Sequence, residues 1–379
     1  MADLPALRLL AHFDTLPDPR DPRGKRHSLA TLLTITLVAM ICGCDEWTEI
    51  EAFGKIKKSL FQQVFKVAQR GIPSHDTFSR VFAALQPQAF QECFSNWTKS
   101  LAAVAEHIAI DGKTMRGSFD TFNERLGSHV VSAYASDESL VLAQIATAEK
   151  SNEITAIPQL LRLLELQNCT VTIDAMGTQT AIAEQIIQSQ GNYVLAVKGN
   201  QPDLHEELRE NFEKVGVQDD SVAVVTDDYG HGRLERRTYT LCPAKDYLTP
   251  QLIARWPQLK TIIMADNHTE FVNGRKEGQI RQERRFFITN LSLVDRKAIT
   301  RSIRNHWSIE NSLHYVLDVA FGEDDNRTRK GNAAVNQSVV RHFSLNLLKR
   351  EKTAKVGIKT RRKMAGWDDK YLLKVLQGS

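Results

Sequence analysis

The chain of 379 residues is predicted to adopt an α/β fold, because its apolar pattern changes three times along the sequence. Apolar residues recur at helical intervals up to about residue 100, and from about residue 105 short strand patterns alternate with helical ones. More strand patterns follow between about residues 201 and 285, and the chain then becomes helical again before a basic end. We therefore predict a helical N-terminal domain (1–100), an α/β domain (101–350) with an insertion at about 201–285, and a basic C-terminal tail (351–379).

The N-terminal domain is expected to contain three helical segments. Leu29–Ile41 is a continuous apolar run, Trp47–Val67 has apolar residues at helical spacing, and a helix through Leu85 follows the turn at Pro73. The apolar run is shorter than the ~20 residues needed to span a bilayer, and it lacks the features of a signal peptide. We expect a buried helix there and no membrane partner.

The α/β domain shows strand and helix patterns in the order β-β-β-α-β-α-β. The segments are 108–111, 129–135 and 140–146 (strands), 154–167 (helix), 170–174 (strand), 180–190 (helix) and 193–197 (strand). Three antiparallel strands continued by parallel ones give a ribonuclease H-like sheet. In that order the first and fourth strands are neighbours, so Asp111 and Asp174 at their ends are expected to lie side by side.

The insertion is predicted to be mostly β. A polar helical pattern at 203–215 precedes strand patterns at 222–226, 237–241 and 261–265, and the hairpin signal at 272–275 precedes a strand at 285–289. From 295 to about 350 the pattern is helical. Glu310 lies there, at the margin of an apolar stripe that includes Ile309, Leu313 and Leu317.

Asp111, Asp174 and Glu310 together form a candidate metal site. Mg²⁺ prefers carboxylate oxygens, and two such ions about 4 Å apart can activate a nucleophile and neutralise the leaving oxygen in phosphoryl transfer. Three carboxylates suffice for two ions, with Mn²⁺ as a substitute. Each acid also has a plainer explanation: a turn or cap for the two aspartates, and for the glutamate an ion pair with Arg304 or a hydrogen bond to a neighbouring histidine.

Basic residues are concentrated near both ends, although the net charge is only +4. Eight of the residues from Lys349 to Lys363 are Lys or Arg, and Asp18–Arg26 adds four more. Such clusters are often solvated faces, but beside an acidic metal site they favour contact with nucleic-acid phosphates. The five cysteines form no C-x-x-C pair, which is typical of reduced thiols in a cytoplasmic protein.

Several residues are candidates for DNA contact. Lys198 could equally belong to a turn with Pro202, and the Gly-flanked loop around His231 could equally be solvated. Glu323–Asp325 is interpreted as an ordinary acidic loop rather than a second metal site. The candidate DNA-binding residues are Lys113, Arg116, Lys198, His231, Arg233, His306, Arg361 and Arg362.

Several blocks of the sequence resemble the bacterial ISAs1-type insertion-sequence transposases, which include the H-repeat-associated proteins. The resemblance covers nearly the whole chain and is carried by IAIDGKTMRGS (108–118), TIDAMGTQ (172–179) and HWSIENSLHYVLD (306–318), with DPRDPRGKRH (18–27), IPSHDTFSRVF (72–82), GHGRLER (230–236) and FGEDD (321–325). It implies a DDE transposase with Asp111, Asp174 and Glu310 as metal ligands. The chain departs from the Tyr/Arg/Glu/Lys signature of a wider transposase group, since His306 and Leu317 replace the Arg and the Lys.

The resulting hypothesis is a Mg²⁺-dependent transposase of a bacterial insertion sequence. It would cleave double-stranded DNA at the element ends and join the freed 3′-hydroxyl to target DNA. Two subunits are expected on DNA because two ends must be held together, in the cytoplasm at the nucleoid. The alternatives are a metal-dependent nuclease without strand transfer and a domesticated, non-catalytic DNA-binding protein.

Overall fold

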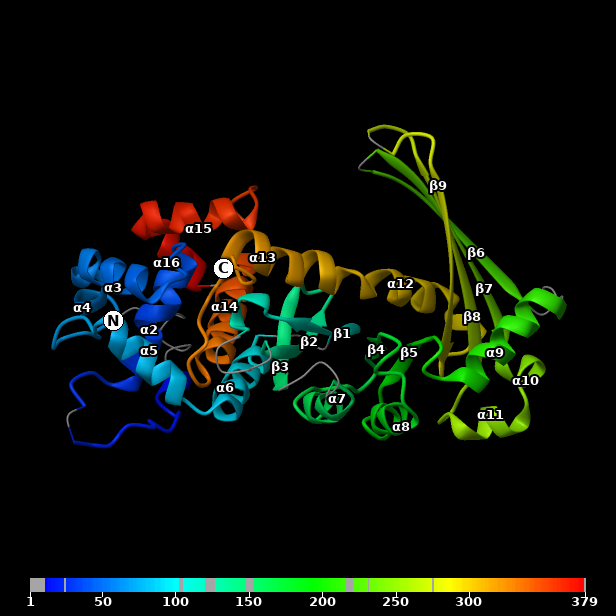
Figure 1. Cartoon of the computed structure of the whole chain (residues 1–379), viewed down its shortest axis with the longest axis horizontal. Helices are drawn as coiled ribbons and strands as arrows, with labels where there is room; N and C mark the ends of the chain where they lie inside the picture. The colour runs from blue at the N-terminus through cyan, green and yellow to red at the C-terminus, as the bar shows by residue number, and fades with distance from the viewer. Residues whose placement is uncertain are drawn as a thin grey trace. The chain divides into compact units, whose positions relative to one another are not determined.

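A computed structural model describes residues 11–23, 25–101, 105–119, 127–147, 153–215, 221–230, 232–274 and 276–377. The chain divides into two compact units (Figure 1), and we describe each by itself. Unit 1 comprises Met1–Ala103, Gly112–Leu164 and Ile309–Ser379, and unit 2 comprises Val104–Asp111 and Glu165–Ser308. Both units draw on segments far apart in sequence, whereas our predicted boundaries follow the order of the chain.

Unit 1 begins with a group of helices whose apolar faces form its core. Ser28 caps the first of them, with its hydroxyl accepting a hydrogen bond from the backbone N–H of Thr31 at 3.1 Å. That helix is buried along almost its whole length, as expected from its apolar run. The predicted helix over 47–67 is instead two helices, which meet at Lys57. The helices are α2 (Leu29–Ile41), α3 (Trp47–Ile56), α4 (Lys58–Gln63), α5 (His75–Ala84) and α6 (Pro87–Lys99).

The C-terminal helices belong to the same unit. α14 (Ala333–Arg350) is buried along most of its length and packs against α2, α5 and α6. The segment that we expected to be a basic tail folds as α15 (Ile358–Trp367) and α16 (Asp369–Gln377), which contact α14. Apolar residues such as Leu372 and Val375 are buried in α16, so this end of the chain is part of the core.

The strands of unit 1 are β2 (His129–Ala135), β3 (Leu140–Thr147) and the last three residues of β1 (His107–Thr114). β2 and β3 form an antiparallel hairpin with an irregularity at Ala133/Tyr134. α6 and α7 (Glu153–Leu161) pack against β3. The helical stretch that carries Glu310 also belongs here and consists of η5 (Glu310–His314) and α13 (Tyr315–Phe321).

Unit 2 is built on a large sheet with strand order β1-β4-β5-β9-β8-β7-β6. β1, β4 and β5 are parallel, and the other pairs are antiparallel. The strands are β4 (Thr170–Ile173), β5 (Asn192–Val197), β6 (Val222–Gly230), β7 (Arg233–Pro243), β8 (Thr261–Phe271) and β9 (Ile280–Thr289). The helices are α8 (Thr180–Gln188), α9 (Pro202–Glu210), α10 (Ala244–Tyr247), α11 (Pro250–Arg255) and α12 (Arg296–His306), with single turns η3 (Asn211–Val215) and η4 (Leu293–Asp295).

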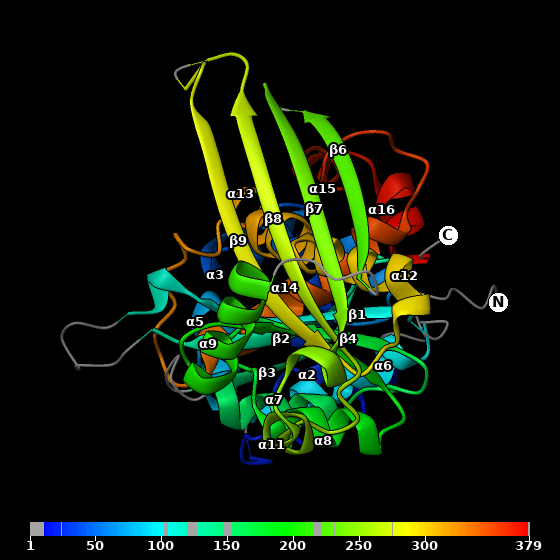
Figure 2. The same ribbon diagram turned by 90° about the vertical axis from the view of Figure 1, so that its right-hand side faces the viewer.

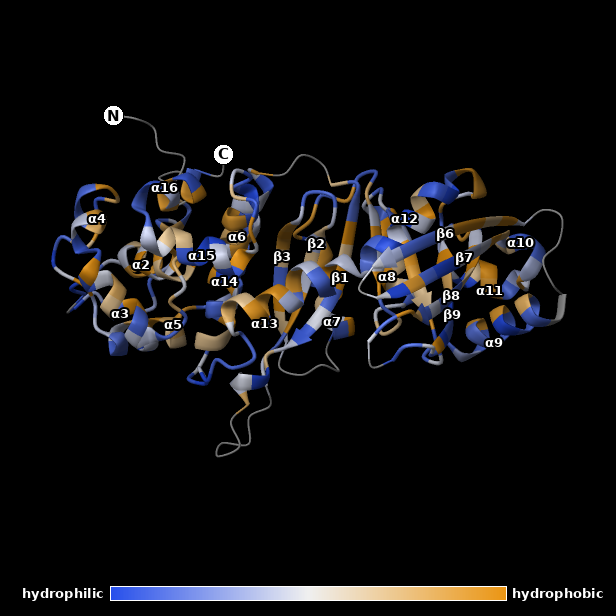
Figure 3. Ribbon diagram, turned by 90° about the horizontal axis from the view of Figure 1, so that it is seen from above, coloured by the Kyte–Doolittle hydropathy of each residue, from blue (hydrophilic) through white to orange (hydrophobic). Residues whose placement is uncertain are grey.

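The four strands β6 to β9 are longer than the sequence patterns indicated. Figures 1 and 2 show them side by side, with their far ends projecting past α9 and α11 of the same unit. The far halves of β6, β7 and β9 are largely exposed and that of β8 is half-buried, and hydrophilic residues colour much of β6 and β7 in Figure 3. The near halves are buried around Leu241, Ile263 and Ile299, which form a core cluster between the sheet and α12.

The sequence predicted the α/β class and the pairing of the first strand with the fourth, and both predictions are confirmed. The loop between β8 and β9 lies where the Asn273-Gly274 signal placed a hairpin. Among the residues that the structure describes, no helix has the length and apolar content that crossing a membrane requires.

Candidate active site

Two of the predicted metal ligands lie where the pairing of β1 with β4 ends in unit 2: Asp111 lies inside β1, which continues to Thr114, and Asp174 directly follows β4. β1 and β4 are parallel, with Ile110 paired to Ile173, so Asp111 and Asp174 each follow a paired residue. The carboxyl ends of parallel strands meet at one edge of a sheet, where ligands commonly bind. Both aspartates are half-buried. The structure therefore brings these two acids to one edge, as expected.

The loop after β4 is fixed in place by hydrogen bonds that we did not predict. Asp174 Oδ1 accepts a hydrogen bond from the backbone N–H of Gly177 at 3.2 Å. Thr178 Oγ1 donates to the carbonyl oxygen of Ala196 at 2.6 Å, which ties this loop to β5. The amide groups of Asn200 and Gln201 donate back to the loop, to Ala175 O at 2.5 Å and to Thr178 O at 2.9 Å. These amides hold the Asp174 loop, and the polar run after β5 was the signal in the sequence.

Lys198 is exposed directly after β5, the third parallel strand. Its backbone carbonyl accepts a hydrogen bond from Gln201 N at 3.0 Å, so a turn does form there. The side chain extends from the same edge of the sheet as Asp174. An exposed ammonium at this edge can contact an anionic substrate, and the turn and the anion contact are compatible with each other.

A chain of three polar side chains lies behind this edge, of which His107 and Thr172 are buried and His306 is half-buried. Thr172 Oγ1, on β4, is 3.0 Å from His107 Nε2 and 3.0 Å from His306 Nδ1. Burial, with smaller contributions from His306 and Arg301, lowers the pKa of His107 to about 3. Burial and Arg285 lower the pKa of His306 to about 4. Both imidazoles are therefore neutral near pH 7. His306 bonds to Thr172 of β4, and its contact with DNA stays a prediction.

Glu310 is the third predicted ligand and belongs to unit 1. It is the first residue of η5, which is a π-helical turn, a feature that often occurs at functional sites. Ile309, Leu313 and Leu317 are buried, so the predicted apolar stripe is confirmed. The side chain of Glu310 itself is exposed rather than half-buried, because it projects away from that stripe.

A buried lysine holds the same helical turn. Lys349 Nζ, on α14, donates to the carbonyl oxygen of Ser312 at 2.7 Å and to the hydroxyl of Tyr134 at 2.8 Å. Burial and the charge of Lys352 lower the pKa of Lys349 to about 7. Sequence analysis placed Lys349 at the start of the basic cluster Lys349–Lys363, and no local pattern marked it as a buried residue.

Lys113 forms ion pairs with an acidic cluster within unit 1. Its Nζ lies 2.8 Å from Asp318 Oδ1, 2.9 Å from Asp324 Oδ1 and 3.4 Å from Glu323 Oε2, and the side chain is only 11% exposed. Burial works against the charge, but the three carboxylates outweigh burial and raise the pKa of Lys113. Its charge is neutralised inside the protein. The acidic loop thus pairs with Lys113, and Glu323 also pairs with Arg341 at 3.4 Å.

The other residues predicted to contact DNA differ in how exposed their side chains are. Arg116 is 81% exposed and lies 3.5 Å from Asp324. Arg233 opens β7 and is exposed apart from a 2.5 Å ion pair with Glu235. His231 lies outside the described residues. Arg116, Arg233 and Lys198 can therefore reach a ligand from the surface.

Arg361 and Arg362 have structural roles, which corrects our prediction of DNA contact. The guanidinium of Arg362 is 4% exposed, pairs with Asp45 at 2.7 Å, donates to Met40 O and stacks 4.0 Å from the Phe321 ring centre. Arg361 donates to the carbonyl oxygens of Leu348, Glu351 and Ala354 at 2.6–2.8 Å. Arg361 thus satisfies carbonyl groups at the end of α14 that the helix leaves unpaired.

The carboxylate oxygens of the predicted ligands suit a hard cation. Carboxylate oxygens such as those of Asp111 and Asp174 are the ligands that Mg²⁺ prefers, and Mg²⁺ is commonly held by one or two of them. Within the part of the chain that the structure describes, no three His, Cys, Asp or Glu side chains are grouped closely enough to hold a metal ion. Two of the three acids predicted as ligands are neighbours within unit 2.

Comparison with known proteins gives matches over nearly the whole chain. A family model described as "Transposase DDE domain" matches residues 102–347, and one described as "DDE_Tnp_1-associated" matches residues 10–98. The H repeat-associated putative transposase YhhI of Escherichia coli K12 is 38% identical over 98% of both chains. The putative transposase YncI of Escherichia coli O157:H7 is 38% identical over 97% of this chain and 94% of its own. The solved piggyBac transposase synaptic complex with hairpin DNA gives a TM-score of 0.45 at 10% identity, over 96% of this chain and 80% of that one, a similarity too low to carry an argument.

Proposed function

The chain belongs to the family of transposases with a DDE domain, together with the H repeat-associated putative transposases, and on this premise we propose that it is an active insertion-sequence transposase. It cleaves double-stranded DNA at the ends of its element and joins the freed 3′-hydroxyl to target DNA. The observation that supports this most is that Asp111 and Asp174 directly follow Ile110 and Ile173, the last paired residues of the parallel strands β1 and β4.

In this proposal Asp111, Asp174 and Glu310 hold two Mg²⁺ ions, with Mn²⁺ as a substitute, on a ribonuclease H-like sheet. The bound ions would activate the attacking oxygen and neutralise charge on the leaving oxygen. The hydrogen bonds of Asn200 and Gln201 keep the loop of Asp174 in one conformation. Neutral His107 and His306 support β4 from behind without adding positive charge beside the ligands.

DNA would be held by exposed cations and by more than one subunit. Lys198 lies at the edge of the sheet that carries Asp111 and Asp174, and Arg116 and Arg233 are exposed elsewhere on the two units. We propose that these three side chains contact phosphates, whereas Lys113, Arg361 and Arg362 are occupied within the protein. Two subunits bind the two element ends, because each end needs one active site.

The test is cleavage of DNA that carries the element ends, with and without Mg²⁺. Asp111→Asn, Asp174→Asn and Glu310→Gln remove one carboxylate charge each and keep the size of the side chain. We expect each to lower the cleavage rate by about a thousandfold or more, as loss of a residue that acts as part of a catalytic unit does, while DNA binding is retained. Asp137→Asn, an exposed acid in the turn between β2 and β3, is the matched control.

A second assay separates transposition from simple cleavage. Pre-cleaved element ends are mixed with target DNA, and joined products are measured. Joined products that depend on the three acids support a transposase, whereas cleavage without joining would identify a nuclease. If all three variants cleave as fast as the wild type, the proposed site is wrong.

A further inference from the structure

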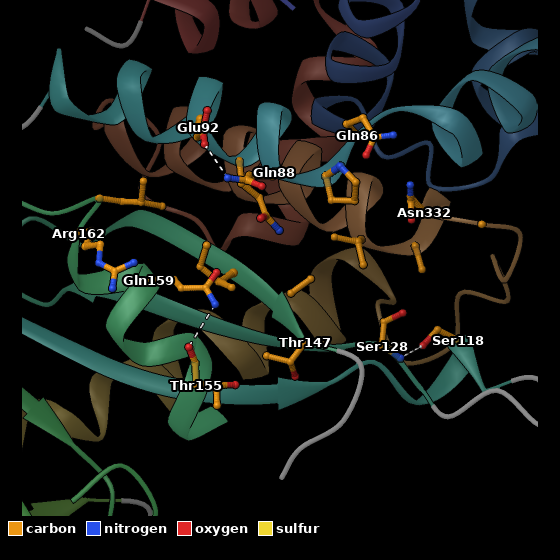
Figure 4. A pocket seen from close by; sticks show the side chains of 18 of the residues that line it. Gln86, Gln88, Glu92, Ser118, Ser128, Thr147, Thr155, Gln159, Arg162 and Asn332 are labelled. Carbon is orange, nitrogen blue, oxygen red and sulfur yellow. Dashed lines mark hydrogen bonds between the residues drawn. The ribbon is translucent and has the colours of Figure 1, made fainter. Parts of the chain in front are cut away.

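Unit 1 contains a polar cavity of about 1090 Å³ that the proposed active site does not use. Figure 4 shows Gln88 of α6, Gln159 of α7 and Asn332 before α14 facing the same hollow, with Thr147 of β3 at its side. Carboxamide and hydroxyl groups make up most of the polar lining. A cavity of this size exceeds the range of about 300–1,000 Å³ found for small-molecule pockets. It has room for a segment of a polymer.

Two helix N-termini open into this cavity. Gln86 and Pro87 at the start of α6, and Asn332 at the start of α14, are among its lining residues. Neither helix has a side-chain cap. Pro87 has no N–H and Ala333 N donates to Lys330 O at 3.0 Å, so the second and third residues of each helix supply the backbone N–H groups available as donors. Asn336 Nδ2 donates to the carbonyl oxygens of Phe82 and Leu85 at 2.8 and 2.9 Å, which ties the start of α14 to the end of α5, just before α6 begins. The N-terminus of a helix favours an anion.

A buried amide in the cavity wall also lacks an acceptor. Gln91 lines the cavity, is 3% exposed, and its Nε2 has no hydrogen-bond partner among the residues that the structure describes. Leaving a buried donor unpaired costs about 1–3 kcal/mol. An acceptor oxygen from a ligand would remove that cost.

Among the described residues of the cavity wall, two are arginines and one is an acid. Arg162 and Arg329 are exposed in the wall, and the described contacts of Arg329 amount to a long 3.4 Å hydrogen bond to Gly117 O. Glu92 is the one acid among the lining residues that the structure describes, and it accepts a hydrogen bond from Gln88 Nε2 at 3.1 Å. Guanidinium groups bind phosphate through paired hydrogen bonds. Carboxamides, hydroxyls and helix N-termini are the groups that contact DNA phosphates and sugars.

We propose that this cavity binds the phosphate backbone of a DNA strand, at a site separate from the catalytic acids. The uncapped starts of α6 and α14, the amide of Gln91 and the two arginines supply the donors. The volume favours several consecutive nucleotides over a single phosphate ion. The proposal rests on the proposed function only in taking DNA as the substrate.

The experiment measures DNA binding by the full chain as a function of salt, without divalent metal so that no cleavage occurs. The variants are Arg162→Gln, Arg329→Gln and their double variant, with Arg162→Lys as the conservative exchange. Arg80→Gln, an exposed arginine of α5 outside the cavity, is the control. Because each lost phosphate contact lowers the slope of log K against log salt by about 1, we expect a loss of about 1 for each single variant and about 2 for the double variant. Arg162→Lys and Arg80→Gln should keep the wild-type slope.

A second arm identifies the source of the phosphate. Inorganic phosphate is titrated into the wild type and the double variant by calorimetry, and we expect no binding below millimolar concentrations. Tight binding of inorganic phosphate that the double variant loses, with unchanged DNA binding, would make this a site for free phosphate and overturn the DNA assignment. A double variant whose salt slope equals that of the wild type would overturn the proposal altogether. Neither result bears on cleavage by Asp111→Asn, so the two proposals fail independently.

Discussion

Ile110 of β1 and Ile173 of β4 are register partners in a parallel pair of strands. The next residue of each strand is an aspartate, so two carboxylates separated by 62 residues of sequence are placed at one edge of the sheet. Carboxylate oxygens are the ligands that Mg²⁺ prefers. A divalent cation bound between them would neutralise their charge, and this relationship leads to the first prediction.

Mg²⁺ is expected to stabilise the wild type and not the variants Asp111→Asn and Asp174→Asn. A ligand that binds only the folded state raises the free energy of unfolding by about 2.7 kcal/mol at a concentration 100 times its Kd. Thermal unfolding with and without Mg²⁺ measures the effect, and Asp137→Asn should respond as the wild type does. An equal shift of Tm in Asp111→Asn would show that the metal binds elsewhere.

The edge that carries Asp111 and Asp174 was predictable because it depends on local patterns. Two apolar runs that each end in Asp predict strand ends, and the order of strands and helices predicts that these two strands are neighbours. The pairing of Ile110 with Ile173 confirms that reasoning. The interior of the longer insertion was harder, because the exposed halves of β6 to β9 have no apolar alternation to reveal them.

The roles of the basic residues could not be predicted from the sequence. Lys349, Arg361 and Arg362 all lie in one basic run, which reads as a solvated tail. In the structure each pairs with groups from segments far away in sequence, such as Tyr134 for Lys349 and Asp45 for Arg362. A charge pattern gives the number of cations but not their long-range partners, so it cannot tell a buried arginine from one that contacts DNA.

Arg362→Gln is expected to lower the free energy of unfolding by about 3–5 kcal/mol, because it leaves Asp45 without its buried partner. The guanidinium also satisfies the carbonyl oxygen of Met40, which a glutamine cannot reach in the same geometry. Urea denaturation measures the change. Lys363→Gln, an exposed neighbour, is the control and should change stability by less than about 0.5 kcal/mol. Weakened DNA binding by Arg362→Gln with unchanged stability would contradict the structural role.

Gly112→Ala tests how tightly the end of β1 is packed within unit 1. A Cβ at residue 112 would overlap Nε2 of His129 and the carboxylate of Glu153, which form a buried 2.6 Å ion pair. Overpacking of this kind costs about 1–3 kcal/mol. We expect a lower Tm and slower cleavage, because Gly112 directly follows Asp111. Gly199→Ala has open space around its Cβ and should behave as the wild type does. A Gly112→Ala variant of wild-type stability would show that the ion pair adapts to the added methyl group.

Acidification is expected to destabilise both units through buried histidines. Burial lowers the pKa of His107 and of His342 to about 3, with smaller contributions from neighbouring cations. Below pH 6.5 the unfolded chain binds protons that these folded residues do not, so the stability contribution present above pH 6.5 is lost as pH falls toward 3. Each histidine adds up to about 1.4 kcal/mol per pH unit to that slope. Urea denaturation between pH 7 and 5 measures how the free energy of unfolding depends on pH. His342→Gln should reduce this slope, and His75→Gln, at an exposed histidine, serves as a control. An unchanged slope in His342→Gln would contradict the assignment.

Lys349→Met is expected to slow cleavage without lowering stability. The ammonium of Lys349 is buried with a pKa of about 7, so an apolar chain of similar length removes the cost of burying a charge while it loses the hydrogen bonds to Ser312 O and to the Tyr134 hydroxyl. These two effects change the free energy of unfolding in opposite directions. Each hydrogen bond makes a net contribution of only about 1 kcal/mol to that free energy, so Tm at pH 7 should change little. Ser312 lies in the π-helical turn that begins at Glu310, and loss of its anchor leaves that carboxylate less well oriented.

A group that orients a metal ligand commonly affects metal affinity by about 10–100-fold. We therefore expect Lys349→Met to raise the Mg²⁺ concentration for half-maximal cleavage by about tenfold, and exposed Lys355→Met to leave it unchanged. Glu310→Gln should show the same direction of change more strongly, because it removes the ligand charge itself. A Lys349→Met variant with wild-type Mg²⁺ dependence and wild-type rate would show that the turn holds Glu310 without its lysine anchor, and a large drop in Tm would assign Lys349 to the stability of the fold instead.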